Sequence, residues 1–269
     1  YFYSYIALYS HRVYLKFMTI AINYKSNLSK KNMSNVVLFV DEKFNISNLK
    51  KFISNSHYSF LTDLLKTSDI KREILNFEIN SKKTIILVSL KKDLSSSSAE
   101  KLGAKLYSYI KEKIKAEYLI DTNSMPLKYR DLLGHFLHGI KLKSYSFEKY
   151  KSKKEKRKIL ISVVGKNMPT NKDKIKFKAI EEGAFFARDL VSEPGNVLHP
   201  DEYAKRINTL KKLGLKINVF DEKKCKKLGM NALLGVGQGS IRGSYLVTME
   251  WNGAKNNSKP LAFVGKGVC

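Results

Sequence analysis

Short apolar runs recur along the chain at intervals that suit strands. Residues 36–40 and 84–90 are uninterrupted aliphatic or β-branched runs, and residues 116–120 and 159–164 repeat the pattern. Runs of this length without polar alternation are typical of strands buried on both faces of a sheet. We therefore expect four strands, of which 36–40 and 84–90 are the buried type, separated by longer amphipathic segments.

The segments between these runs have helical periodicity. The serines of 95–98 are suitable helix N-caps, and a second helix is expected after Pro126. The apolar positions at helical spacing are Leu102, Leu106 and Tyr109 in the first helix, and Leu133, Phe136, Leu137 and Ile140 in the second. Strand and helix thus alternate, which predicts an α/β fold class.

Residues 150–158 interrupt this pattern with a run of lysines that we interpret as an exposed connection. A long helix is predicted from Lys174 to about residue 191, and Pro194 ends it. Its expected apolar stripe consists of Phe177, Ile180, Ala184, Ala187 and Val191. Pro200 then suits the first position of another helix, for which Gly214 is a suitable C-terminal cap.

The last part of the chain predicts a second α/β unit. Residues 215–219 and 245–251 alternate between apolar and polar positions, as half-buried strands do, and residues 261–264 read as a buried strand. Asp221 is placed to cap a short helix that Gly229 would close.

The most informative feature of the composition is its net charge. The 269 residues include 50 Lys and Arg against 24 Asp and Glu, a formal net charge of +26. Such a surplus attracts polyanions, including nucleic acid. The positive residues are scattered, however, and the abundance of residues with AT-rich codons explains them more simply. We rank compositional bias above nucleic-acid binding.

The termini and cysteines indicate a soluble cytoplasmic protein. Cys225 and Cys269 are too far apart and too few to form a disulfide framework or a zinc knuckle, which fits a reducing compartment. The chain begins with Tyr1, and Met18 and Met33 are alternative starting points. Its opening residues are a poor signal peptide, and we expect no membrane span.

Two glycine-containing segments are weak candidates for phosphate binding. Residues 235–239 lack the third glycine of the dinucleotide fingerprint, so we interpret them as a tight connection. Gly265-Lys266 fails as a P-loop, because Pro260 and Gly267 stand where glycine and Ser or Thr are required.

Two other candidates have structural interpretations. His135 and His138 lie three apart on one predicted helix without a nearby Cys, Asp or Glu, so we interpret them as a core-edge and a surface histidine rather than metal ligands. Cys225 lacks an evident basic partner and is expected to be structural.

Three ordered blocks resemble the leucyl aminopeptidase (cytosol aminopeptidase) family. They are ARDLVSEPGNVL at 187–198, LGMNALLGVGQGS at 228–240 and AFVGKGV at 262–268. Residues 144–150 are also similar to a Ser-Tyr-x-Phe-x-x-Tyr junction of that family. His199 departs from the Thr that usually precedes this proline, which is expected to weaken a helix cap.

The resemblance implies an N-terminal macro-like three-layer α/β domain, placed at 18–150, and an incomplete α/β peptidase domain at 151–269. It also implies removal of N-terminal residues from peptides with two divalent cations, manganese or zinc. Such ions polarise the peptide carbonyl and activate water. By the resemblance alone, Lys266 is a metal ligand, and the family assembles as hexamers.

The remaining family ligands and the catalytic residues are expected beyond Cys269, which stands in the position of a family Thr. We therefore expect the 269-residue chain, as a fragment or the product of a split gene, to bind no metal pair and to be inactive alone. The alternative is a non-enzymatic basic protein that binds nucleic acid or a protein partner.

Overall fold

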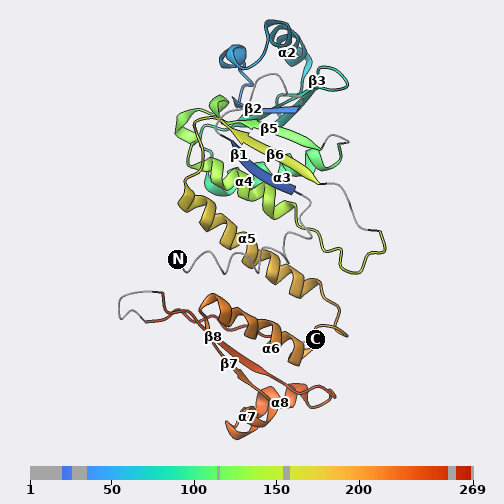
Figure 1. Cartoon of the computed structure of the whole chain (residues 1–269), viewed down its shortest axis with the longest axis vertical. Helices are drawn as coiled ribbons and strands as arrows, with labels where there is room; N and C mark the ends of the chain where they lie inside the picture. The colour runs from blue at the N-terminus through green and yellow to red at the C-terminus, as the bar shows by residue number, and fades with distance from the viewer. Residues whose placement is uncertain (1–19, 26–34, 114–115, 154–157, 254–258, 268–269) are drawn as a thin grey trace. The chain divides into compact units, whose positions relative to one another are not determined.

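The computed structural model describes residues 20–25, 35–113, 116–153, 158–253 and 259–267 (Figure 1). Two compact units meet in sequence between Phe185 and Phe186, within helix α5 (Asn171–Ser192). The part up to Phe185 is called the first unit and the part from Phe186 the second unit. Met18, Met33 and Cys269 lie outside the described residues.

A six-stranded sheet forms the centre of the first unit. Its strands are β1 (Ile20–Lys25), β2 (Asn35–Asp41), β3 (Ile74–Glu78), β4 (Thr84–Leu90), β5 (Glu117–Asp121) and β6 (Ile159–Val164). They lie in the order β1-β6-β5-β2-β4-β3, and every neighbouring pair is parallel except β3 with β4. In the central pair β2 and β4, Val36 is opposite Ile85.

Helices cover both faces of this sheet, because alternate side chains of each strand point to opposite faces. On one face, α3 (Ser96–Lys111) and α4 (Leu132–Lys143) pack against Val37 and Phe39. On the other, the short 3-10 helix η2 (Ser47–Lys51) and α2 (Asn55–Thr67) pack against Val36 and Leu38 (Figure 1). Two 3-10 turns, η3 (Thr122–Ser124) and η4 (Leu127–Tyr129), connect β5 to α4.

The four predicted strands and both predicted helices are confirmed in the first unit. Ser95 caps α3, since its hydroxyl accepts a hydrogen bond of 3.2 Å from the Ser98 amide. The four apolar positions predicted for α4, from Leu133 to Ile140, are all buried. Residues 151–153 and Lys158 of the charged run are exposed, and residues 154–157 lie outside the described part.

Strand β6 joins the sheet of the first unit between β1 and β5. Residues 159–164 therefore share a core with residues 20–143. The division expected at 150 and 151 would assign this strand to the following domain, whereas the two compact units divide later, within α5.

Helix α5 buries a different stripe from the one predicted. Phe177, Glu181 and Phe185 are buried, whereas Ile180 is 46% and Val191 86% exposed. The expected stripe followed apolar residues only, and it missed Glu181 because a carboxylate is rarely buried without a partner. Glu181 has such a partner in His138, so a polar residue occupies the buried face.

The second unit contains α6 (Pro200–Asn208), the 3-10 helix η5 (Thr209–Leu213), β7 (Lys216–Phe220), α7 (Glu222–Lys227), α8 (Asn231–Gly237) and β8 (Leu246–Glu250). Strands β7 and β8 form a two-stranded antiparallel sheet. The predicted Asp221 cap is confirmed, since its carboxylate accepts from the Lys224 amide at 2.9 Å. Gly214 and Gly229 have positive φ at the ends of η5 and α7, as their capping roles require.

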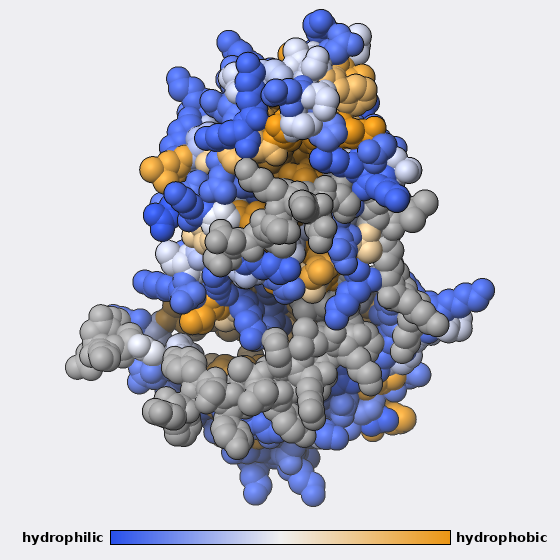
Figure 2. All heavy atoms as spheres, turned by 45° about the horizontal axis from the view of Figure 1, so that its top comes forward, coloured by the Kyte–Doolittle hydropathy of each residue, from blue (hydrophilic) through white to orange (hydrophobic). Residues whose placement is uncertain are grey.

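The described surface mixes polar and apolar residues. In the view of Figure 2, hydrophilic residues are spread between smaller hydrophobic patches. Within the described ranges, no helix is both long enough and apolar enough to cross a membrane.

Candidate functional site

Residues 261–264, which precede the candidate ligand Lys266, do not form the predicted buried strand. The segment 259–267 has no regular secondary structure, and the exposed fractions of Leu261, Phe263 and Val264 are 81%, 88% and 98%. A buried strand requires hydrogen-bonded neighbours. In the described part of the second unit, β7 and β8 pair only with each other, so the segment has no adjacent strand.

Lys266 itself is exposed, and the neighbouring Gly267 lies near α6. A Cβ on Gly267 would be 3.9 Å from the Tyr203 ring. A divalent cation of the expected kind needs several oxygen or imidazole ligands held together. Within the described ranges there is no group of three or more His, Cys, Asp or Glu that could hold a metal ion. The described residues therefore do not fit a two-metal centre, and Lys266 alone does not make one.

The first family-like block is fixed to α6 by a buried carboxylate. The Glu193 side chain is only 3% exposed, and its Oε1 lies 3.0 Å from an Arg206 guanidinium nitrogen. Arg206 also donates through Nε to Glu202 at 3.0 Å. Burial lowers the pKa of Arg206, but hydrogen bonds and charges from both glutamates outweigh burial and raise it. The block is thus held by a charge-assisted pair.

The loop after the second block is tied to the start of the same helix. Arg242 donates to Asp201 at 3.2 Å, and the imidazole of His199 also pairs with Asp201. Burial raises the pKa of Asp201, but hydrogen bonds from His199 and from its own amide, with the Arg242 charge, produce a net lowering. His199 stands at the N-cap of α6 and makes no side-chain cap hydrogen bond.

These two ion-pair groups organise the second unit without supplying a nucleophile. Both converge on α6, at Asp201 near its start and at Arg206 near its end. The carboxylates of Glu193, Glu202 and Asp201 are each paired with an arginine, so none of them is placed as a free general base. The arrangement links the first family-like block and the loop after the second block to α6, which is a structural role.

The remaining sequence candidates are resolved as structural features. Gly235 and Gly237 lie inside helix α8, so the predicted tight connection at 235–239 is wrong in its first half. A Cβ on Gly237 would lie 2.1 Å from the Ser244 hydroxyl, so the Ser244 side chain would have to rotate to make room for it. Cys225 is fully buried, and its Sγ lies 3.7 Å from the Phe220 carbonyl oxygen, in agreement with a structural role.

Neither histidine of α4 is a surface residue, contrary to the prediction for one of them. His138 is buried and its Nδ1 lies 2.9 Å from Glu181, while Nδ1 of His135 lies 2.8 Å from Glu100. These pairs could not be predicted from the sequence, because their glutamates, Glu100 and Glu181, come from α3 and α5. Each histidine has one carboxylate, and neither belongs to a described group of three potential metal ligands.

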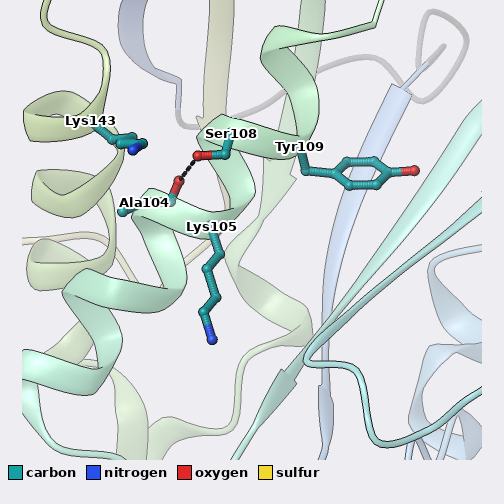
Figure 3. A pocket seen from close by; sticks show the side chains of 5 residues that line it. All are labelled: Ala104, Lys105, Ser108, Tyr109 and Lys143. Carbon is teal, nitrogen blue, oxygen red and sulfur yellow. Dashed lines mark hydrogen bonds between the residues drawn. The ribbon is translucent and has the colours of Figure 1, made fainter.

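A surface hollow of about 470 Å³ lies over α3 and α4 in the first unit (Figure 3). The Ser108 hydroxyl in its wall donates to the Ala104 carbonyl oxygen at 3.2 Å, and Lys105 pairs with Glu73. Figure 3 shows Lys105 and Tyr109 pointing in different directions. Specific ligand sites have a few polar groups that converge, and this hollow does not.

Comparisons with known proteins give one family. Residues 185–269 match the catalytic domain of the cytosol aminopeptidase family. A probable cytosol aminopeptidase of Bradyrhizobium is 46% identical over 136 residues, 49% of this chain and 27% of that protein. One of Nitrobacter winogradskyi is 39% identical over 182 residues, 65% of this chain and 36% of that protein. The chain therefore spans about a third of the length of the relatives it matches.

Two solved structures have a similar fold over part of their length. A tomato leucine aminopeptidase variant has a TM-score of 0.66 at 18% identity, with 86% of this chain and 50% of that chain covered. The bottromycin maturation enzyme BotP, solved in complex with Mn, has a TM-score of 0.60 at 17% identity, with 81% and 45% covered. At these identities the likeness concerns the mixed α/β fold.

Proposed function

Because residues 185–269 belong to the cytosol aminopeptidase family, we propose that this polypeptide is part of a metalloaminopeptidase that removes N-terminal residues, leucine among them, from peptides. The observation that carries the proposal is the ordered set of blocks at 187–198, 228–240 and 262–268, which lie in the matched part. Relatives of similar sequence are named cytosol aminopeptidases, and on that basis we propose a cytoplasmic location.

We propose that the first unit corresponds to the family's N-terminal macro-like domain. Its parallel sheet with helices on both faces supports this assignment. On the same reasoning β6 belongs to this domain, because it is hydrogen-bonded between β1 and β5. We place the start of the catalytic part within α5 rather than at residue 151.

In the active protein, two divalent cations, manganese or zinc, would supply Lewis-acid chemistry at the scissile peptide bond. We propose Lys266 as one ligand, which requires its amine to be deprotonated by competition from the metal. The described ranges contain no group of three or more His, Cys, Asp or Glu that could complete such a site. We therefore expect the 269-residue chain by itself to hold no metal pair and to hydrolyse no peptide.

The direct test is an assay of the purified 269-residue chain with leucine p-nitroanilide, with and without added Mn²⁺ or Zn²⁺. No metal-dependent turnover is expected. Addition of a polypeptide carrying the rest of a relative's catalytic domain is expected to produce metal-dependent turnover that Lys266→Ala removes. The matched control is Lys259→Ala, on the same exposed segment. Turnover by the chain alone would refute the expected inactivity, and equal activity of both variants would refute the role of Lys266.

The net charge of +26 favours a second candidate, a basic protein that binds nucleic acid. Against this candidate, several lysines lie over aromatic rings of the chain itself. The distance from Nζ to the ring centroid is 5.0 Å for Lys50 over Tyr58 and 4.2 Å for Lys174 over Tyr24. A salt titration of binding to duplex DNA tests this candidate. A real phosphate footprint gives a steep linear loss of log affinity with log salt, and a flat profile refutes it.

A further inference from the structure

A second hollow of the first unit, of about 450 Å³, is lined by residues of β3, β4, β5 and the C-terminal end of α3. We call it the strand-end hollow. Its most buried lining residues are Thr84 and Ile86 of β4 and Tyr118 of β5. Tyr109 of α3 also lines it, and the ring of this residue extends away from Lys143 (Figure 3). The volume lies in the range of small-molecule sites, and the lining is more apolar than polar.

An ammonium group of the chain itself already lies at this hollow. Glu78 ends β3, opposite Thr84 of β4, and Lys113 follows the C-terminal end of α3. Nζ of Lys113 is 3.6 Å from Oε1 of Glu78 and 5.3 Å from the centroid of the Tyr109 ring. A carboxylate and an aromatic face are the two groups that attract an ammonium ion. The hollow therefore has the surroundings that a cationic amine requires.

The charges of the strand-end hollow also favour a cation. The chain has a net charge of +26, yet the described residues that line this hollow include two glutamates, Glu78 and Glu112, and one lysine. Within the described ranges, the exposed Glu112 has no ion-pair partner. The last carbonyl groups of α3 add a partial negative charge at this end of the helix. A ligand cation can thus pair with Glu112 while Glu78 keeps Lys113.

Asn76 of β3 contributes an acceptor that lacks a donor. Its side chain lines the hollow, and its Oδ1 is buried without a hydrogen-bond partner in the part of the chain that the structure describes. Asn76 is opposite Ile86, two residues before Glu78, so both polar side chains lie on the same face of the sheet. An unpaired buried acceptor destabilises the fold, and a ligand donor would remove this penalty. Rotation of the amide about its last torsion allows the oxygen to accept from the hollow.

We propose that the strand-end hollow binds a small aromatic amine in its ammonium form. The ammonium group donates to the Glu112 carboxylate and to the Asn76 oxygen, and the ring packs against Ile86 and Tyr109. An ammonium ion has three donors and no acceptor, which matches this pair of acceptors. An anionic ligand would instead meet two carboxylates. The site belongs to the first unit and does not depend on the proposed aminopeptidase activity.

A ligand-observed NMR titration of the full 269-residue chain with 2-phenylethylamine tests the site. Saturable binding is expected. 2-Phenylethanol has the same ring and chain without the charge, and its Kd is expected to be at least about tenfold higher, because hydrogen bonds between charged groups are stronger than neutral ones. 3-Phenylpropionate carries a negative charge and is not expected to bind. No saturable binding of the amine, or equal Kd values for the amine and the alcohol, overturns the proposal.

Matched variants locate the binding site. Glu112→Gln removes the carboxylate partner and is expected to raise the Kd of 2-phenylethylamine about tenfold. Lys113→Gln removes the competing ammonium group and is expected to lower this Kd about threefold. The controls make the same charge changes outside the hollow, Glu182→Gln on α5 and Lys101→Gln on α3, and are expected to leave the Kd unchanged.

The Glu112 and Lys113 side chains both reach solvent, so these variants are expected to fold, which circular dichroism checks. A Kd unaltered by Glu112→Gln, or raised by Lys113→Gln, overturns the proposal. Equal effects of the site variants and their controls would indicate attraction by net charge alone and would also overturn it.

Discussion

Replacement of Gly139 by alanine tests the close contact between α3 and α4 in the first unit. A Cβ at this position would lie 1.9 Å from the Glu100 carbonyl oxygen, and one at Gly103 would lie 1.9 Å from the Phe136 carbonyl oxygen. Both obstacles are backbone atoms of the facing helix, which cannot move away by a rotamer change. Gly139→Ala therefore forces the two helices apart by about 1.5 Å to reach an ordinary contact distance.

The expected change in the free energy of unfolding is the sum of two opposing contributions. Overpacking of a tight contact costs about 1–3 kcal/mol, and a backbone obstacle places this case near the upper end. Alanine in place of glycine within a helix stabilises the folded state by about 1 kcal/mol. The net loss in free energy of unfolding is about 2 kcal/mol, which corresponds to a decrease in Tm of roughly 4–8 °C for a unit of this size.

The assay is thermal unfolding of the full chain followed by circular dichroism. Gly183→Ala is the matched control, since Gly183 lies within α5 and a Cβ there meets nothing within 4 Å. That variant is expected to raise the free energy of unfolding by up to about 1 kcal/mol. The same chemical change thus has opposite effects at the two sites. An unchanged or raised Tm for Gly139→Ala would refute the close helix crossing.

Three further outcomes are expected. Glu193→Gln removes the buried charge that pairs with Arg206, and urea denaturation should show a loss of about 2 kcal/mol in the free energy of unfolding. This loss is below the range for a fully buried pair because the Arg206 side chain is 23% exposed. A change under about 0.5 kcal/mol would contradict this expectation. The hydrogen bond from Lys105 lowers the pKa of Glu73, so this pair stabilises the chain above the carboxyl's unfolded pKa and the stabilisation is lost as pH falls. Glu73→Gln should therefore flatten the acidic side of a plot of Tm against pH, and an unaltered acidic side would count against the pair. Cys225→Ser places a hydroxyl at a fully buried position and should cost about 1–2 kcal/mol in thermal unfolding, whereas no loss would indicate an accessible thiol.

The central strands and α4 were predictable because their signal is local. An uninterrupted apolar run such as 84–90 has few alternatives to a buried strand, and it forms β4. Strands β1 and β3 were not foreseen. Each lies at an edge of the sheet, where polar residues such as Asn23 and Asn76 interrupt the apolar run. Edge strands carry a weaker pattern because one side lacks a neighbour.

The polar partnerships could not be predicted because they join distant parts of the sequence. Glu181 lies 43 positions from His138, and Arg242 lies 41 positions from Asp201. Only the fold brings such residues together, and this explains why Glu181 was absent from the predicted α5 stripe. Residues 261–264 show the converse error, since a strand-like sequence forms no strand without a neighbour to pair with.

The position of β1 in the sheet has a consequence for synthesis of the protein. This strand precedes all the other described elements, yet its hydrogen-bonded neighbour is β6, about 130 residues later in the chain. At ribosomal rates of roughly 5–20 residues per second, β6 follows β1 on the order of 10 s later. Strands β2, β3 and β4 are complete by residue 90 and can pair during that interval. The first of the described strands is thus among the last of them to pair, and until then its backbone must be kept from pairing elsewhere.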